Sequence, residues 1–119
     1  MSYSPGEVAE KTGFSIDTLR YYERIGLLSP IERTTGGRRT FSDEDVDWLG
    51  TLRCLRDTGM PIARMQRYAE LTRTEQTEAE RLRILEEHDA EVSRRIAELE
   101  SQREYIRSKI NWYREVAGA

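Results

Sequence analysis

Apolar residues recur at alternating spacings of three and four along the last third of the chain, among charged residues. This spacing predicts one long helix over about 76–116 with a heptad seam on one face. A single helix has nothing to bury such a seam against, so we expect two copies of the chain to pair through it. The predicted homodimer interface consists of Leu82, Leu85, Val92, Ile96, Leu99, Ile106, Ile110 and Tyr113.

A second apolar stripe lies off this seam, at Ile84, Tyr105 and Trp112. A two-stranded coil would leave these side chains in water. We therefore expect them to pack on the head of the partner chain, which an antiparallel coiled coil would bring to that position. The alternative is a set of scattered, exposed aromatic residues.

The first 74 residues predict short helices over 5–11, 15–25, 43–58 and 61–71. Three of these starts share one pattern, an N-capping serine with an aromatic residue before it that can pack on the next turn: Tyr3-Ser4, Phe14-Ser15 and Phe41-Ser42. The first two helices are joined by a tight turn over 12–14, which is typical of a helix-turn-helix. The segment 27–41 has glycines at its centre and Arg38-Arg39 after them, which favours a two-stranded wing over a plain solvated loop.

The predicted fold is therefore mainly α-helical: a winged helix-turn-helix over 1–74, followed by a dimerisation helix over 75–119. Charged residues make up 34% of the 119 residues, and no apolar run is long enough to span a membrane. The N-terminus resembles no signal peptide, so we expect a soluble, cytoplasmic protein. One cysteine and one histidine cannot form a disulfide or a zinc site within the chain, so no metal or cofactor is expected, nor is an enzyme.

The second predicted helix, 15–25, has one face for the core and one for a ligand. With Leu19 at the centre of the buried face, two arginines, a tyrosine and an aspartate fall on the opposite side. The net charge of −3 argues against nucleic acid, but Lys and Arg slightly outnumber Asp and Glu in the first 42 residues. The alternative is an ordinary solvated helix surface. The candidate DNA contacts are Ile16, Asp17, Thr18 and Arg20 for base edges, Tyr21 and Arg24 for the backbone, and Arg38 and Arg39 on the wing.

Four motifs in Tyr3–Leu71 resemble the DNA-binding domain of the MerR family of transcriptional regulators: SPGEVAEKTG, TLRYYERIGLL, GGRRTFSDEDV and LRDTGMPI. The long last helix is similar to the family's antiparallel dimerisation coil. The resemblance implies a homodimer that distorts a promoter for RNA polymerase. It also implies that Thr18, Arg20 and Tyr21 contact DNA from the recognition helix, with Arg38 and Arg39 on the wing. The family often has an aromatic residue where Arg38 stands.

Cys54 lies on the opposite face of its predicted helix from Leu52, together with Gly50 and Thr58. One interpretation is a small residue buried at a close helix contact; the other is a thiol sensor. The chain's short length and its YYERIGLL motif resemble the AdhR/NmlR branch of the family, which implies a response to reactive aldehydes and other electrophiles through Cys54. No metal-loop cysteines and no effector domain follow the coil, so metal sensing is not expected.

Two other functions fit parts of the pattern. An architectural, excisionase-like DNA-binding protein would share the small winged head, although the long coil argues against it. A coiled-coil interaction module would use the head to bind protein instead of DNA. Salt-dependent affinity for DNA separates the second alternative from a DNA-binding regulator.

Overall fold

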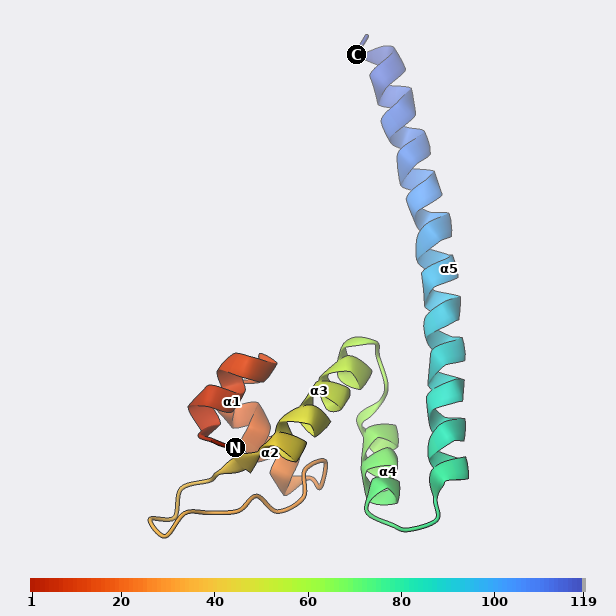
Figure 1. The fold of residues 1–119 in the computed structure, drawn as a ribbon. Coiled ribbons are helices and arrows are strands. Elements are labelled where there is room, and N and C mark those ends of the chain that lie inside the picture. The colour runs from red at the N-terminus through yellow and green to blue at the C-terminus, as the bar shows by residue number, and fades with distance from the viewer. Residues whose placement is uncertain (119) are drawn as a thin grey trace. The chain divides into compact units, whose positions relative to one another are not determined.

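The computed structural model describes residues 1–118, which form five helices and one two-stranded antiparallel sheet (Figure 1). Contacts divide the chain into a compact head, Met1–Ile84, and a second unit that begins at Leu85. The elements are β1 (Ser2–Tyr3), α1 (Pro5–Thr12), α2 (Ile16–Arg24), β2 (Phe41–Ser42), α3 (Asp43–Asp57), α4 (Ile62–Thr72) and α5 (Glu78–Val116).

The three predicted serine caps are confirmed. Ser4, Ser15 and Ser42 each accept a hydrogen bond from the backbone N–H three residues later. The carboxylates of Glu7 and Asp45 in turn accept a hydrogen bond from the cap N–H in α1 and α3. These bonds satisfy backbone donors that a helix start leaves without partners, so each start is set locally by the sequence.

The turn between α1 and α2 depends on Gly13. Its φ of 78° lies in the left-handed region, and its N–H donates to the Ala9 carbonyl. A Cβ built on Gly13 would meet Nη1 of Arg53, the side chain that donates to the Thr12 carbonyl. The left-handed backbone conformation favours glycine here, whereas the Arg53 guanidinium is the end of a flexible side chain and could move away from a Cβ.

The core of the head lies where α1, α2 and α4 pack around α3. Leu49 and Leu52 of α3 are completely buried, as are Val8 of α1 and Met65 of α4. The Phe14 ring before α2 packs edge-on against Tyr22 with 5.3 Å between ring centroids. This packing holds α2 to the head by one face only.

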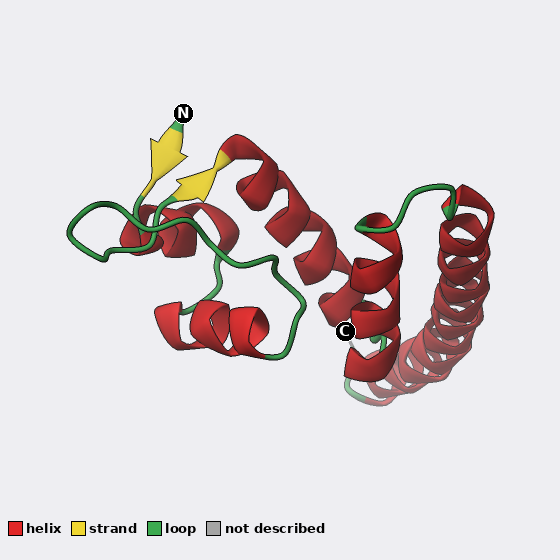
Figure 2. Ribbon diagram, turned by 90° about the horizontal axis from the view of Figure 1, so that it is seen from below, coloured by secondary structure: helices red, strands yellow, loops and turns green. Residues whose placement is uncertain are grey.

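The wing is less regular than a two-stranded hairpin. Phe41 pairs with Tyr3 at the N-terminus, and Figure 2 shows the two short strands side by side. Within 27–41 the wing has a rising limb before its tip at Gly36-Gly37 and a returning limb after it. The two limbs meet at one bridge, Arg33 to Arg39, and at two flanking backbone hydrogen bonds between residues 32–34 and 38–40. Leu27, Leu28 and Ile31 are buried in the core, and Pro30 has no N–H to donate. The rising limb therefore follows the core until just before the tip.

The last two helices begin later than the sequence pattern predicts. Pro61 is the N-cap of α4 and lies outside the helix, since its ring fixes φ at −61° while ψ stays extended. The chain then turns through Gln76, whose φ is 61°, so that α5 starts at Glu78 instead of 76.

The prediction that Ile84 lies on an apolar stripe which packs on the head of the partner chain is wrong. Ile84 is 7% exposed and belongs to the hydrophobic core of its own head. The Thr77 hydroxyl donates to the Leu71 carbonyl, and Arg67 of α4 pairs with Glu80 at 3.1 Å. These contacts hold the first turns of α5 beside α4, so the compact unit extends to Ile84.

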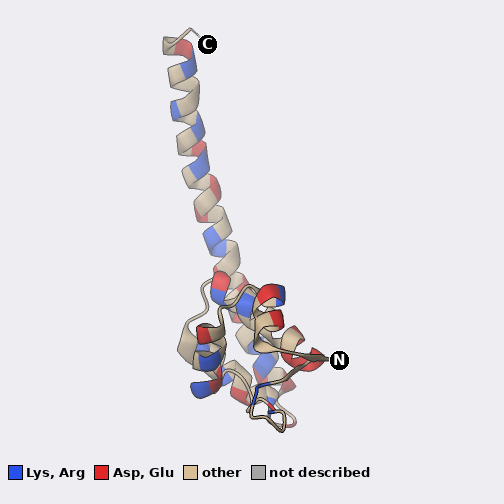
Figure 3. Ribbon diagram, turned by 90° about the vertical axis from the view of Figure 1, so that its left-hand side faces the viewer, with Lys and Arg blue, Asp and Glu red and all other residues tan. Residues whose placement is uncertain are grey.

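From Leu85 on, the second unit is a single helix with mixed charge, as Figure 3 shows by its interleaved colours. Arg94 pairs with Glu91 and Glu98 on its own helix. The predicted seam residues are exposed, apart from the partly buried Val92, and so are Tyr105 and Trp112. Among the described helices, none combines the length and hydrophobicity that a membrane span needs.

Candidate nucleic-acid interface

Helix α2 has a capped start, and its C-terminal end is tied to other helices of the head. Ser15 caps its start, and the carbonyls just beyond its last turn accept hydrogen bonds from other helices. The Trp48 indole of α3 donates to Leu27 at 2.8 Å, and the Gln66 amide of α4 donates to Ile25 at 2.9 Å. Because α2 is anchored in this way, its outer face is presented by a rigid support.

The two faces of α2 are divided as the helical pattern predicts. Leu19 and Tyr22 are each 3% exposed, and the polar residues of the opposite side are exposed. Ile16, at the start of the helix, is exposed as well. The outer face carries Asp17, Arg20, Tyr21 and Arg24.

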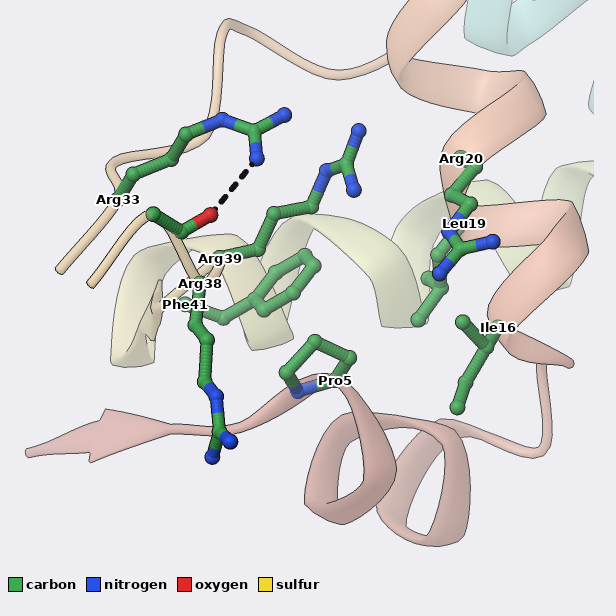
Figure 4. Close-up of a pocket in the computed structure, with 9 residues that line it drawn as sticks. Pro5, Ile16, Leu19, Arg20, Arg33, Arg38, Arg39 and Phe41 are labelled. Carbon is green, nitrogen blue, oxygen red and sulfur yellow. Dashed lines mark hydrogen bonds between the residues drawn. The ribbon is translucent and has the colours of Figure 1, made fainter.

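A cavity of about 330 Å³ lies between the start of α2 and the wing. Figure 4 shows Ile16 and Arg20 from α2 on one side and three wing arginines on the other. Its lining consists of Pro5, Ile16, Leu19, Arg20, Arg33, Gly37, Arg38, Arg39 and Phe41. Four guanidinium groups and no carboxylate line this cavity, so it suits an anion such as a backbone phosphate.

The wing tip is held by its own hydrogen bonds. Arg33 crosses the tip and donates through Nη1 to the Gly37 carbonyl at 2.9 Å, drawn as the dashed line in Figure 4. Gly37 has a φ of 82° and donates its N–H back to Thr34. Arg38 and Arg39 extend in opposite directions from this limb (Figure 4). The two neighbouring arginines therefore have different surroundings.

Arg39 is held by a carboxylate. Its Nε donates to Oε1 of Glu23 at 2.8 Å, and Oε2 of Glu23 accepts from the Ile31 backbone N–H at the same distance. Burial raises the pKa of Glu23, but the bonds from Ile31 and Arg39 and the charges of Arg39 and Arg33 outweigh it and hold that pKa below its ordinary value. Since the folded pKa is depressed, the pair stabilises the head above the unfolded pKa and loses this contribution as the pH falls through the folded one.

The other predicted DNA contacts lie outside the cavity lining. Arg24 packs its guanidinium 5.3 Å from the centroid of the Tyr21 ring, so these two side chains form one unit on the outer face. Asp17 is exposed beside them. The Thr18 hydroxyl lies 2.8 Å from Oγ of Ser15, which engages it in the cap of its own helix.

Two residues of this region were absent from the candidates predicted from the sequence. Arg33 lines the cavity, yet its sequence position on a loop gave no sign of which way it points. Glu23 did carry a signal, because the helical pattern places its carboxylate close to the buried face of α2. A carboxylate in that position needs a cationic partner, and Arg39 supplies it.

Cys54 is exposed, so no element of its own chain buries it in the part that the structure describes. The interpretation of a residue buried at a close helix contact stays a prediction, because the helix expected to approach Cys54 is the terminal helix of a second copy. A Cβ at the neighbouring Gly50 would also meet nothing within 4 Å. Within residues 1–118, no group of three His, Cys, Asp or Glu side chains could hold a metal ion.

Comparison with known proteins agrees with this geometry. Residues 3–72 match the model of the MerR helix-turn-helix family of regulatory proteins, and residues 46–109 match a second model described as MerR, DNA binding. A helix-turn-helix transcriptional regulator of Haemophilus influenzae is 39% identical over 95% of this chain and 84% of its own length. The regulator AdhR of Bacillus subtilis is 38% identical over 55% of this chain and 46% of its own length.

The fold is also similar to solved structures. A crystal structure of HiNmlR, described as a MerR family regulator lacking the sensor domain and bound to promoter DNA, has a TM-score of 0.90 and 37% identity. That likeness covers 100% of this chain and 95% of the other. With a family model that covers residues 3–72 and a relative aligned along nearly the whole chain, this protein belongs to the MerR family of helix-turn-helix regulatory proteins.

Proposed function

We propose that this chain regulates transcription by binding promoter DNA as a homodimer and distorting it for RNA polymerase. The observation that carries this proposal is the cavity between α2 and the wing, with four arginines from two elements around it. An arginine fork binds a phosphate or a guanine edge in a fixed geometry, and a rigid helix presents it. Since promoters lie in the cytoplasm of a bacterial cell, we expect the protein there. The DNA-bound HiNmlR structure supports the same function by similarity.

The exposed seam of α5 supports dimerisation. Leu99, Ile106 and Tyr113 are each more than half exposed, which is unusual for large apolar side chains in a heptad pattern. A second copy of the same helix presents the same stripe, and burying both stripes removes this apolar surface from water. We propose an antiparallel pair, which places the two heads apart along a duplex.

A spin label at residue 114 distinguishes the two directions of pairing. In a Cys54→Ser, Arg114→Cys chain labelled on both copies, an antiparallel pair separates the labels by roughly 50 Å along the helices at 1.5 Å per residue. A parallel pair brings the labels within about 20 Å, since packed helices lie 8–10 Å apart. A short distance contradicts the proposed arrangement of the heads.

The DNA-binding function is tested by a salt titration of affinity, first on a random-sequence duplex and then on an operator selected from genomic fragments. The logarithm of the binding constant should fall linearly with the logarithm of the salt concentration, with a slope of about −0.9 for each phosphate neutralised. A protein-interaction module shows no such dependence. An architectural protein binds in this way but leaves transcription by RNA polymerase from the selected promoter unchanged.

The response to electrophiles through Cys54 stays a prediction, which the exposure of this thiol makes testable. Alkylation of Cys54 by a reactive aldehyde should change promoter output or operator geometry and leave the dimer intact. The measurement compares transcription in vitro from the selected promoter before and after treatment, for the parent chain and for Cys54→Ser. An equal response of the two chains excludes Cys54 as the sensor.

A further inference from the structure

The carboxylate of Glu23 lies where α2 meets the wing, and it contacts both limbs of the wing. One oxygen accepts from the Ile31 N–H on the rising limb, and the other accepts from Nε of Arg39 on the returning limb, each at 2.8 Å. The side chains of Arg39 and Glu23 are only 24% and 19% exposed. Such a pair is shielded from solvent more than the exposed ion pairs elsewhere on the head.

The sign of the charge on Glu23 is unfavourable for DNA binding. A carboxylate beside a cavity lined with four arginines lowers the attraction of that cavity for a phosphate. Its partner Arg39 also has its Nε donor committed to the carboxylate and not to a ligand. Attraction of DNA therefore does not explain why a carboxylate lies at this position, whereas the contacts of Glu23 with the wing do.

Beyond its base, where Ile31 is buried and Phe41 pairs with Tyr3, the wing has few contacts that fix its position. Its limbs share one bridge and two flanking backbone hydrogen bonds, and an isolated two-stranded hairpin is marginally stable in water. Beyond Ile31 the wing residues before Arg39 are exposed, so packing does not hold the tip against the head. Glu23 is attached to the rigid helix α2 and reaches both limbs.

We propose that Glu23 is a positioning residue that joins both wing limbs to α2, with Arg39 as its partner, and so sets the separation between Arg38 on the wing and Arg20 on α2. This inference rests on the proposed DNA-binding function. It gives the two neighbouring wing arginines different roles: Arg38 contacts the phosphate backbone, and Arg39 holds the wing. A fixed separation reduces the entropy that the wing loses on binding.

The affinity of Glu23→Gln for a random-sequence duplex tests the role in binding. We expect the affinity to fall about tenfold or more, because the carboxylate charge and one of its two acceptor oxygens are lost from each head. Removal of a negative charge without a positioning effect predicts the opposite sign. Glu32→Gln is the matched control, since it removes the same charge from an exposed side chain of the rising limb and should bind equally or slightly more tightly. Equal or tighter binding by Glu23→Gln overturns the proposal.

A double-mutant cycle with Arg38→Ala shows whether Glu23 acts through the wing. When Arg38 no longer contacts DNA, Glu23→Gln should cost much less affinity than it does alone. An undiminished cost means that Glu23 does not act through Arg38 and contradicts the proposal. If Glu23→Gln does not fold, Arg39→Gln takes its place in the same cycle. Because this variant also removes a positive charge from the cavity, only the part of its cost that disappears together with Arg38 supports positioning.

Hydrogen exchange without DNA separates failure of this inference from failure of the proposed function. The Ile31 amide should exchange at least about tenfold faster in Glu23→Gln, while amides of the α3 core keep their protection. Unchanged protection at Ile31 overturns the positioning role whether or not the chain binds DNA. Faster exchange combined with salt-independent affinity of the parent chain leaves the positioning contact standing and refutes DNA binding alone.

Discussion

A chain that carries Leu99→Glu and Ile106→Glu should be a monomer, and it should bind its operator about 10²–10⁴-fold more weakly than the parent chain. Both residues lie on the exposed seam of α5, and both are more than half exposed in the single chain. Two glutamates in a paired seam would place charges in an apolar interface without partners. A dimer binds its second half-site intramolecularly, and the monomer loses this advantage.

The matched control is Ser101→Glu with Ser108→Glu, which adds the same two charges to the side of α5 away from the seam. This chain should remain a dimer with unchanged affinity. Light scattering gives the oligomeric state, and fluorescence anisotropy gives the affinity. A Leu99→Glu, Ile106→Glu chain that stays dimeric excludes this seam as the interface.

Arg20→Ala should weaken operator binding by about 1–3 kcal/mol for each head, which is a loss of roughly 30-fold or more for the dimer. Arg20 is exposed on α2 and lines the cavity opposite the wing arginines. Its position near the start of the helix lets it reach base edges when the helix enters the major groove by its N-terminus. We therefore expect the largest loss on the selected operator and a smaller loss on random DNA.

Two other arginines provide the comparison. Arg24→Ala should weaken binding to both DNAs equally and make the salt dependence shallower, because Arg24 packs on Tyr21 at the end of α2 away from the cavity and is predicted to contact the backbone. Arg73→Ala removes the same charge from the exposed C-cap of α4 and should leave the affinity unchanged. Equal losses on operator and random DNA for Arg20→Ala would remove this residue from the base-reading set.

Features that depend on residues close together in the chain could be predicted from the sequence. Ser4, Ser15 and Ser42 cap their helices through bonds to residues three positions later, so their spacing was sufficient. The buried face of α2 and the seam of α5 follow from helical periodicity in the same way. These signals are local, because each needs only the geometry of one helix.

The membership of the MerR family was also accessible from local motifs, since they lie in one order along most of the chain. The heptad seam indicated that α5 needs a partner helix. The exposure of the seam in the single chain agrees with that expectation, and the proposed dimer supplies the second helix that covers it.

Tertiary structure decided which residues meet across long stretches of sequence. Ile84 fits an off-seam stripe by periodicity, but the first turns of α5 pack beside α4 and bury Ile84 in the head. Phe41 was expected to pair within the wing and instead pairs with Tyr3 at the N-terminus. In both cases the local pattern predicted which face of the element is apolar, whereas the path of the chain determined which residues pack against that face.

Arg38 and Arg39 also show the difference between what local sequence predicts and what the fold decides. The sequence alone determined that a pair of arginines follows a glycine turn and that an outward-facing helix carries others. Only the fold brought Glu23 within 2.8 Å of Arg39, sixteen residues later, and left Arg38 exposed. Helical and strand periodicity fix the direction of a side chain relative to its own element, whereas its partner depends on where the chain places every other element.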